Sequence, residues 1–247
     1  MPLTDFQKGV ARVIAANRSP ENHIGGGAVI NRGETGLRTS DDLDIFHDAL
    51  GGGRNAGAIV AASATTDQQS LITAGYFVQW VIRGDGFFRA IVSRDNEHVR
   101  LDWVADTAYR FFPVQEDAEF GYCLHRADLA TNKVLALVGR SEVRDFLDIL
   151  QLDQEYLSLG SIIWAACGKD EGYTPSLILD MTNRHANYQE NDLRSENLVR
   201  KVDLKVLKHQ WISARKRAEA LCYPITSRGN WLPIPRQEPQ PRDARPS

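Results

Sequence analysis

The sequence lacks several patterns that would assign a chain of 247 residues to a class at once. Its three cysteines (Cys123, Cys167 and Cys222) form no CxxC pair, so neither a disulfide framework nor a structural zinc site is indicated. It has no run of 18 apolar residues, and its start lacks the charged and apolar regions of a signal peptide. We therefore expect a cytoplasmic protein with reduced thiols and no membrane association.

Common catalytic motifs are also missing. The six histidines are dispersed and form no HxH or HExxH cluster, and His47-Asp48 is the one His-Asp pair, so a metal-dependent hydrolase is the weakest functional alternative. No glycine loop is followed by GK[ST], and none has the GxGxxG spacing. The net charge of -3 gives no overall basic field, so a nucleic-acid partner would have to meet a local patch.

The order of apolar patterns predicts a mixed first half and a helical second half. Residues 3–16 have the periodicity of an amphipathic helix, and residues 42–46 that of a strand, which a glycine cluster at residues 51–53 is expected to end. Three runs with period two, 77–82, 87–92 and 99–104, predict an antiparallel meander. Helices are expected at 128–139, 141–153, 155–166, 174–186 and 196–221. We predict a sheet domain (1–126), a helical domain (127–232) and a disordered tail (233–247).

The segment Ser40-Asp41-Asp42-Leu43-Asp44 carries the strongest chemical signal. Residues two apart in a strand point the same way, so Asp42 and Asp44 present two carboxylates on one face. Paired carboxylates repel each other unless a cation lies between them, and hard oxygen ligands suit Mg²⁺ or Mn²⁺. Such ions also neutralise charge in phosphoryl or nucleotidyl transfer. The alternative is a polar strand end with solvated aspartates.

A glycine cluster precedes this strand. Gly25, Gly26 and Gly27 lie between a strand-like His23-Ile24 and a potentially helical segment, where backbone N–H groups can approach phosphates closely. On its own, such a cluster is more often a turn.

Three charged residues of the helical half stand out. Lys133 interrupts an apolar stripe, so its amine either reaches out to solvent or meets an anion inside a cleft. Asp145 and Asp148 share one helix face, where the alternative is an ordinary solvated surface. In the sheet half, Asp102 is either a third carboxylate beside the Asp42–Asp44 pair or a residue on an exposed edge strand.

Residues 23–46 (HIGGGAVINRGETGLRTSDDLDIF) and 127–150 (ADLATNKVLALVGRSEVRDFLDIL) together resemble the nucleotidyltransferases of the AbiEii/AbiGii toxin family. This family is known from phage abortive infection and toxin–antitoxin pairs. The first block is similar to its glycine pair and Ser-acid-Asp-hydrophobic-Asp motif. The second is similar to its D-L-x-x-x-K helix with R-D-x-x-D.

The resemblance implies an α+β fold, a polymerase-beta-like nucleotidyltransferase sheet domain followed by a helical domain. It implies that Asp42 and Asp44 hold the metal and the nucleoside triphosphate, and that the glycines lie close to its phosphates. Lys133 would contact the triphosphate, and Asp145 would complete the site as the base that activates an acceptor hydroxyl. Ser40 and Asp148 belong to the same two motifs and are expected to contribute to nucleotide binding. A nucleoside monophosphate would pass to an acceptor such as tRNA or another RNA, and a cognate antitoxin protein is expected.

A nucleotide- or RNA-binding protein without transfer activity is the alternative. The predicted C-terminal helix carries clustered cations, which would give a salt-dependent affinity for phosphates, with Trp211 among them. These cations are Arg200, Lys201, Lys205, Lys208, Arg215, Lys216 and Arg217. Because acidic residues are mixed with them, a solvated amphipathic face explains the same pattern.

Overall fold

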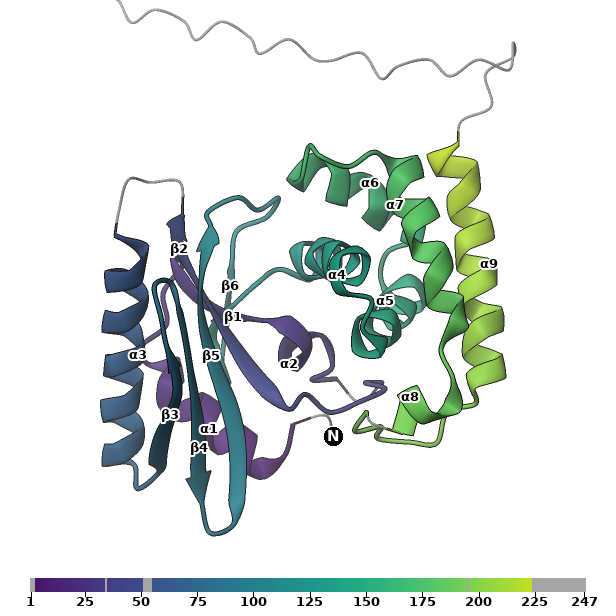
Figure 1. Cartoon of the computed structure of the whole chain (residues 1–247). Coiled ribbons are helices and arrows are strands. Elements are labelled where there is room, and N and C mark those ends of the chain that lie inside the picture. Colours follow the sequence, from purple (N-terminus) through teal and green to yellow (C-terminus); the bar gives the residue numbers. More distant parts are fainter. Residues whose placement is uncertain (1–2, 34, 51–54, 195, 224–247) are drawn as a thin grey trace, which may run out of the picture.

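One mixed sheet organises the first half of the chain. The protein is seen here as a computed structural model that describes residues 3–33, 35–50, 55–194 and 196–223. Within these residues the strands are β1 (Asn22–Gly25), β2 (Asp42–Leu50), β3 (Phe77–Arg83), β4 (Phe87–Arg94), β5 (Glu97–Thr107), β6 (Gln115–Asp117) and β7 (Gly121–Cys123). Their spatial order is β3-β4-β5-β2-β1-β7-β6. The predicted meander is confirmed, because β3, β4 and β5 pair antiparallel in succession, whereas β2 lies parallel to β5 (Figure 1).

Two helices, α1 (Asp5–Ala15) and α3 (Ala56–Thr73), pack on one face of the sheet (Figure 1). The predicted N-terminal helix is confirmed: Phe6, Val10 and Ile14 form its buried stripe. Thr4 caps its first turn, because the Thr4 hydroxyl accepts a hydrogen bond from the backbone N–H of Gln7. Helix α3 was not expected from the sequence. The second glycine cluster, residues 51–53, was expected to end strand β2 and lies outside the described residues.

The second half is helical, as predicted, with different boundaries. Its elements are α4 (Arg126–Arg140), α5 (Val143–Glu155), α6 (Leu159–Lys169), α7 (Pro175–Met181), the 3-10 helix η1 (Thr182–Asn187), α8 (Glu190–Arg194) and α9 (Leu204–Cys222). The prediction of one helix over 174–186 was wrong, since α7 is followed there by a 3-10 turn. The helix predicted at 196–221 begins only at Leu204, where the Asp203 side chain caps it. None of the described helices is both long and apolar enough for a membrane span.

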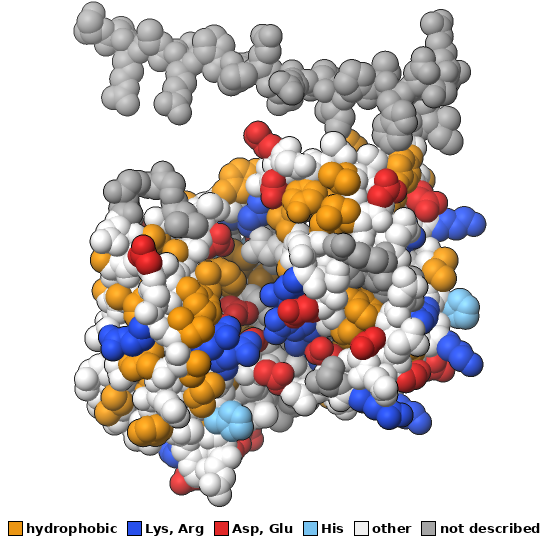
Figure 2. All heavy atoms as spheres, viewed as in Figure 1, with side chains coloured by type: hydrophobic (Ala, Val, Ile, Leu, Met, Phe, Trp, Pro, Cys, Tyr) orange, Lys and Arg blue, Asp and Glu red, His pale blue; other side chains and the backbone are white. Residues whose placement is uncertain are grey.

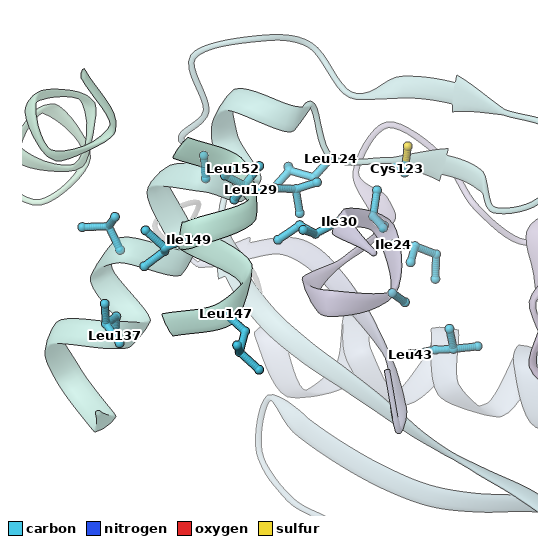
Figure 3. Packing of buried hydrophobic residues seen from close by; sticks show 14 of the residues in the cluster. Ile24, Ile30, Leu43, Cys123, Leu124, Leu129, Leu137, Leu147, Ile149 and Leu152 are labelled. Atoms are coloured by element: carbon cyan, nitrogen blue, oxygen red, sulfur yellow. The ribbon is translucent and has the colours of Figure 1, made fainter. Parts of the chain in front are cut away.

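Apolar side chains from both halves meet in one continuous core. Figure 3 shows Ile30 beside Leu129 of α4, with Ile24 and Leu43 on the sheet side and Leu147 of α5 on the helical side, and all five are buried in one cluster. The short helix α2 (Gly26–Ile30) joins the two sets, because it packs on both β2 and α4. The sheet ends at Cys123 and α4 begins at Arg126, but the predicted division into two domains at this point stays a prediction. The predicted disordered tail lies outside the described residues.

A segment from the helical half also pairs with the loop before strand β2. The backbone N–H of Thr39 donates to the Asn197 carbonyl at 2.8 Å, and that of Val199 donates to the Leu37 carbonyl at 3.0 Å. Arg38 and Leu198 form the β-bridge between them. The chain that leads into the Asp42–Asp44 strand is therefore held by residues far away in the sequence.

Candidate active site

A cleft of about 540 Å³ lies between the sheet and helices α4 and α5. Its charged lining consists of Arg38, Asp42, Asp44, Arg89, Arg100, Asp102, Asp106, Lys133, Arg140, Arg144 and Lys169. Figure 2 shows the hollow between the two halves, with acidic and basic side chains gathered around it. With seven cationic and four acidic side chains, the cleft suits an anionic ligand that also brings a cation.

Three of the four cleft carboxylates, Asp42, Asp44 and Asp102, are neighbours on strands β2 and β5. Asp42 and Asp44 point the same way from β2, as predicted, and the parallel register places Asp44 beside Asp102 of β5. Asp42 is 7% exposed, so the alternative of a solvated strand end is wrong for Asp42, and Asp44 is half-buried. The edge-strand alternative for Asp102 is also wrong, because β5 lies between β4 and β2.

The local electrostatics differ sharply between the two carboxylates of β2. Burial and the neighbouring charge of Asp42 raise the pKa of Asp44 well above its ordinary value, so its ionised form needs a further positive charge. Burial also works to raise the pKa of Asp42. There the charges of Arg100 and Arg144 and a hydrogen bond from Ser40 outweigh it and hold the pKa below its ordinary value.

Two arginines on neighbouring strands contact these carboxylates. Arg89 of β4 grips Asp102 through two hydrogen bonds, Nε to Oδ1 at 2.7 Å and Nη2 to Oδ2 at 2.6 Å. Arg100 of β5 donates to Oδ2 of Asp42. Neither arginine was predicted as a site residue. For Arg100 the period-two alternation of a strand could have predicted this, because it places Arg100 on the same face as Asp102.

The glycine cluster gives the Asp44 carboxylate room. Gly26 has φ +68°, a left-handed conformation that favours glycine, and a Cβ there would lie 2.0 Å from Oδ2 of Asp44. A Cβ on Gly27 would lie 2.4 Å from Nη2 of Arg38. Gly26 and Gly27 line the cleft, whereas Gly25 does not; a Cβ on Gly25 would lie 2.7 Å from Cε2 of the Phe46 ring.

Ser40, expected to contribute to nucleotide binding, is buried and does not line the cleft. Its hydroxyl donates to Oδ1 of Asp42 at 3.0 Å, and its carbonyl accepts a hydrogen bond from the Gln7 side chain at 2.6 Å. The contacts of Ser40 therefore orient Asp42.

Lys133 reaches the cleft floor and meets two carboxylates there. Its Nζ lies 2.9 Å from Oδ1 of Asp145 and 2.8 Å from Oδ2 of Asp148. The alternative of an amine reaching out to solvent is wrong, because Lys133 is 7% exposed. An ammonium group has three donors, so one N–H remains for a ligand in the cleft.

Asp148 is a buried anchor for cationic side chains. Besides Lys133, it accepts two hydrogen bonds from Arg38, at 2.9 and 2.8 Å, and one from Asn31 at 2.8 Å. Burial would raise the pKa of Asp148, but the charges of Lys133 and Arg38 lower it to about 2. Asp148 lies beneath the cleft and does not line it, so its place in nucleotide binding is to orient other side chains.

Asp145 also lies beneath the cleft, where it binds Lys133 and Arg140. Burial would raise its pKa, but a hydrogen bond from Arg140 and the charge of Lys133 hold it below its ordinary value. A general base must reach the hydroxyl that it deprotonates, and a fully buried Asp145 does not. The expected role as base is therefore not supported by its position. The alternative of a solvated face is wrong for both Asp145 and Asp148.

The sequence did not single out most of the cationic lining. Arg38, Arg140, Arg144 and Lys169 come from loops and helix ends, where no periodicity marks an inward residue. Of the cations in this cleft, Lys169 is the one without a carboxylate of the described residues within ion-pair distance. His47, the other candidate near this strand, is buried and contacts the Val104 carbonyl at 3.3 Å, which is a structural contact.

The carboxylates fit a divalent cation by their chemistry and by the strand face that they share. Asp42, Asp44 and Asp102 supply hard oxygen ligands on one face, and a Cβ in place of Gly26 would fill the space beside Asp44. In the described part of the chain, three or more His, Cys, Asp or Glu side chains are nowhere gathered closely enough to hold a metal ion. At the cleft, Arg89 and Arg100 engage Asp102 and Asp42 individually.

The arrangement of strands, carboxylates and helical half defines a nucleotidyltransferase-like fold. The sequence matches no protein-family model and no curated protein. In structure, the chain is similar to MenT4, nucleotidyltransferase toxin Rv2826c from Mycobacterium tuberculosis H37Rv, with a TM-score of 0.60 and 16% identity over 91% of this chain and 84% of that chain. It is also similar to JHP933 from Helicobacter pylori, with a TM-score of 0.51 and 15% identity over 87% of this chain and 91% of that chain. These similarities confirm the predicted fold class.

Proposed function

We propose that this protein is a metal-dependent nucleotidyltransferase that moves a nucleoside monophosphate from an NTP to an acceptor hydroxyl. The observation that carries the proposal is the meeting of Asp42, Asp44 and Asp102 on one face of a cleft lined by seven cationic side chains. Carboxylates of this kind bind Mg²⁺ or Mn²⁺, and the surrounding cations favour a polyphosphate.

Each group of cleft residues has a separate role in the proposed reaction. Asp42 and Asp44 would hold the divalent cation, with Asp102 as a third ligand, and the bound ion would neutralise charge on phosphoryl oxygens. Lys133 has one N–H to offer a phosphate oxygen, while Asp145 and Asp148 fix its position. Gly26 and Gly27 make room for the side chains of Asp44 and Arg38 and line the cleft, where phosphates would lie close to the backbone. Catalysis then rests on positioning and electrostatic stabilisation rather than on covalent chemistry by the protein.

The acceptor and the biological role complete the proposal. We propose tRNA or another RNA as acceptor and a cognate antitoxin protein as partner, with the protein acting as the toxin of an abortive-infection or toxin–antitoxin system. The motif resemblance to the AbiEii/AbiGii family supports this, as does the structural similarity to a nucleotidyltransferase toxin.

The C-terminal helix offers a less favourable surface for RNA. Trp211 is fully buried and packs edge-on against Phe146, so its ring is not available to contact RNA. Arg217 pairs with Asp153 at 2.6 Å. The exposed Lys205 and Lys216 remain available on this helix, and the cleft is the stronger candidate for phosphate contact.

A transfer assay tests the proposal. Purified protein is incubated with Mg²⁺, total tRNA and each α-labelled NTP in turn, beside Asp44→Asn and the matched control Asp95→Asn. Asp95 lies at an exposed turn with φ 52°, which asparagine tolerates. We expect label in RNA with the wild type and the control but not with Asp44→Asn.

Full turnover by Asp44→Asn would refute the assignment of the site. If no NTP gives labelled RNA, while equilibrium dialysis still shows nucleotide binding, either the acceptor is not RNA or the protein is the non-catalytic binder of the alternative hypothesis.

A further inference from the structure

Arg89 and Arg100, on the cleft face of the sheet, bind two of the carboxylates that would hold a divalent cation. Both oxygens of Asp102 accept hydrogen bonds from Arg89. Both oxygens of Asp42 are also occupied, Oδ1 by Ser40 and Oδ2 by Arg100. A cation that takes Asp42 and Asp102 as ligands therefore competes with these guanidinium groups for the same oxygens.

The same two arginines are partly exposed to solvent. Each side chain is 30% exposed, and each reaches its carboxylate from a neighbouring position on the sheet. Their anchoring differs from that of Arg38, which is 5% exposed and fixed by the fully buried Asp148. Displacement of Arg89 or Arg100 would leave the guanidinium partly in water, so it does not strand a buried charge.

Guanidinium groups also suit the other ligand of a nucleotidyltransferase. Their planar fork binds phosphate as well as carboxylate, and both arginines line the cleft. A metal–nucleotide complex brings a cation for the carboxylates and phosphate oxygens for the arginines at the same time.

We propose that Arg89 and Arg100 are internal counter-cations. In the free protein they neutralise Asp102 and Asp42 and oppose binding of a divalent cation alone. When a metal–nucleotide complex enters, they exchange these carboxylates for phosphate oxygens. This inference rests on the proposed function, because it takes the same carboxylates as the metal ligands. It makes binding of cation and nucleotide mutually reinforcing, since each ligand releases the groups that the other needs.

The test is Mn²⁺ binding without nucleotide, followed by the electron paramagnetic resonance signal of the free ion. We expect Arg89→Ala to bind Mn²⁺ more tightly than the wild type by about 10- to 150-fold, the range for losing a charge-assisted hydrogen-bonded competitor. Arg89→Lys keeps the charge but loses the two-pronged grip, and we expect it to retain a clear part of the gain.

Two controls distinguish direct competition between Arg89 and Mn²⁺ for Asp102 from a general change in the electrostatic potential of the cleft. Arg140→Gln removes the same charge from the cleft lining without touching Asp42, Asp44 or Asp102. An equal gain with Arg140→Gln would overturn the proposal. In an Asp102→Asn background the gain from Arg89→Ala should disappear, and its persistence there would likewise overturn it.

The nucleotide provides the second readout. A non-transferable NTP analogue should tighten Mn²⁺ binding by a larger factor in the wild type than in Arg89→Ala, because the variant lacks the exchange. Equal factors would refute the exchange step. These measurements need no transfer, so a protein that shows them without labelling RNA fails the proposed function but not this inference. A protein that labels RNA while Arg89→Ala leaves Mn²⁺ affinity unchanged fails this inference alone.

Discussion

Replacing the buried Asp148 by asparagine should cost the fold a large share of its stability. Asp148 accepts hydrogen bonds from Arg38 and Asn31 and pairs with Lys133, all at 2.8 to 2.9 Å. Its pKa falls from 3.8 to about 2, and this difference corresponds to roughly 2.5 kcal/mol of stabilisation at neutral pH. Removing one partner of a buried ion pair typically costs about 3–5 kcal/mol, because the other charge stays buried. We therefore expect a loss of about 3–4 kcal/mol for Asp148→Asn.

Urea unfolding at pH 7.5 measures this loss. With a slope of about 3 kcal/mol per M, the midpoint should fall by about 1 M. Glu155→Gln on the same helix is the matched control. Glu155 pairs with Arg126 at the surface, and such pairs contribute about 0.5 kcal/mol or less.

The pH dependence gives a second check on Asp148. A carboxylate whose folded-state pKa is depressed stabilises the fold above its unfolded-state pKa, and this stabilisation is lost as pH falls through the folded-state pKa. The difference between wild type and Asp148→Asn should therefore be constant from pH 5 to 8 and shrink only between about pH 4 and 2. A variant within 1 kcal/mol of wild type at pH 7.5, with nucleotide affinity lost, would refute the anchoring role. Asp148 would then act as a direct nucleotide ligand.

Two further predictions concern single positions. Gly26→Ala should reduce transfer at least about 100-fold and destabilise the fold by about 1–3 kcal/mol, because the new Cβ would collide with Asp44 and the φ of residue 26 is left-handed. The transfer assay and urea unfolding measure the two effects. Near-normal turnover would contradict the prediction. Burial lowers the pKa of His47 to about 4, so the unfolded chain binds protons on this residue first and stability falls as pH drops from 6.5 to 4. Between pH 6.5 and 4 the free energy of unfolding of His47→Gln should fall by about 2–3 kcal/mol less than that of the wild type. His98→Gln, at an exposed position, is the control. An equal pH dependence of stability in His47→Gln and the wild type would contradict the prediction.

The parts of the fold that follow from local pattern were predictable. Alternation in residues 77–104 led to the meander, and the apolar spacing of residues 5–15 led to α1. Helix α3 escaped prediction because its buried stripe consists of Val60, Ala64, Asp67 and Leu71 in a segment rich in alanine and threonine. A buried aspartate interrupts the apolar pattern there. Its partners, Arg18 and Trp103, lie far away in sequence, so no local signal marks Asp67 as an inward residue.

In the candidate site, too, local pattern predicted some features, and others depend on residues far apart in the sequence. Spacing alone placed Asp42 and Asp44 together, but nothing in the sequence fixes the parallel register that brings Asp102 beside Asp44. Lys133 and Asp145 were expected to contact ligand, yet their contact with each other depends on how α4 packs against α5. Charged residues of one chain can pair with each other as well as with a ligand. Only the packing shows which of these occurs.

The pairing of residues 37–39 with residues 197–199 has a consequence for the order in which the protein is made. Synthesis proceeds from the N-terminus, and the early part of a chain usually begins to fold before the rest has emerged. The loop that leads into the Asp42–Asp44 strand, however, gains its hydrogen-bonding partner only after about four-fifths of the chain has left the ribosome. Arg38 in this loop also lacks its ion-pair partner until Asp148 has been synthesised. The cleft is therefore completed late in synthesis, and a ribosome-bound fragment that already contains both aspartates lacks the framework that positions them.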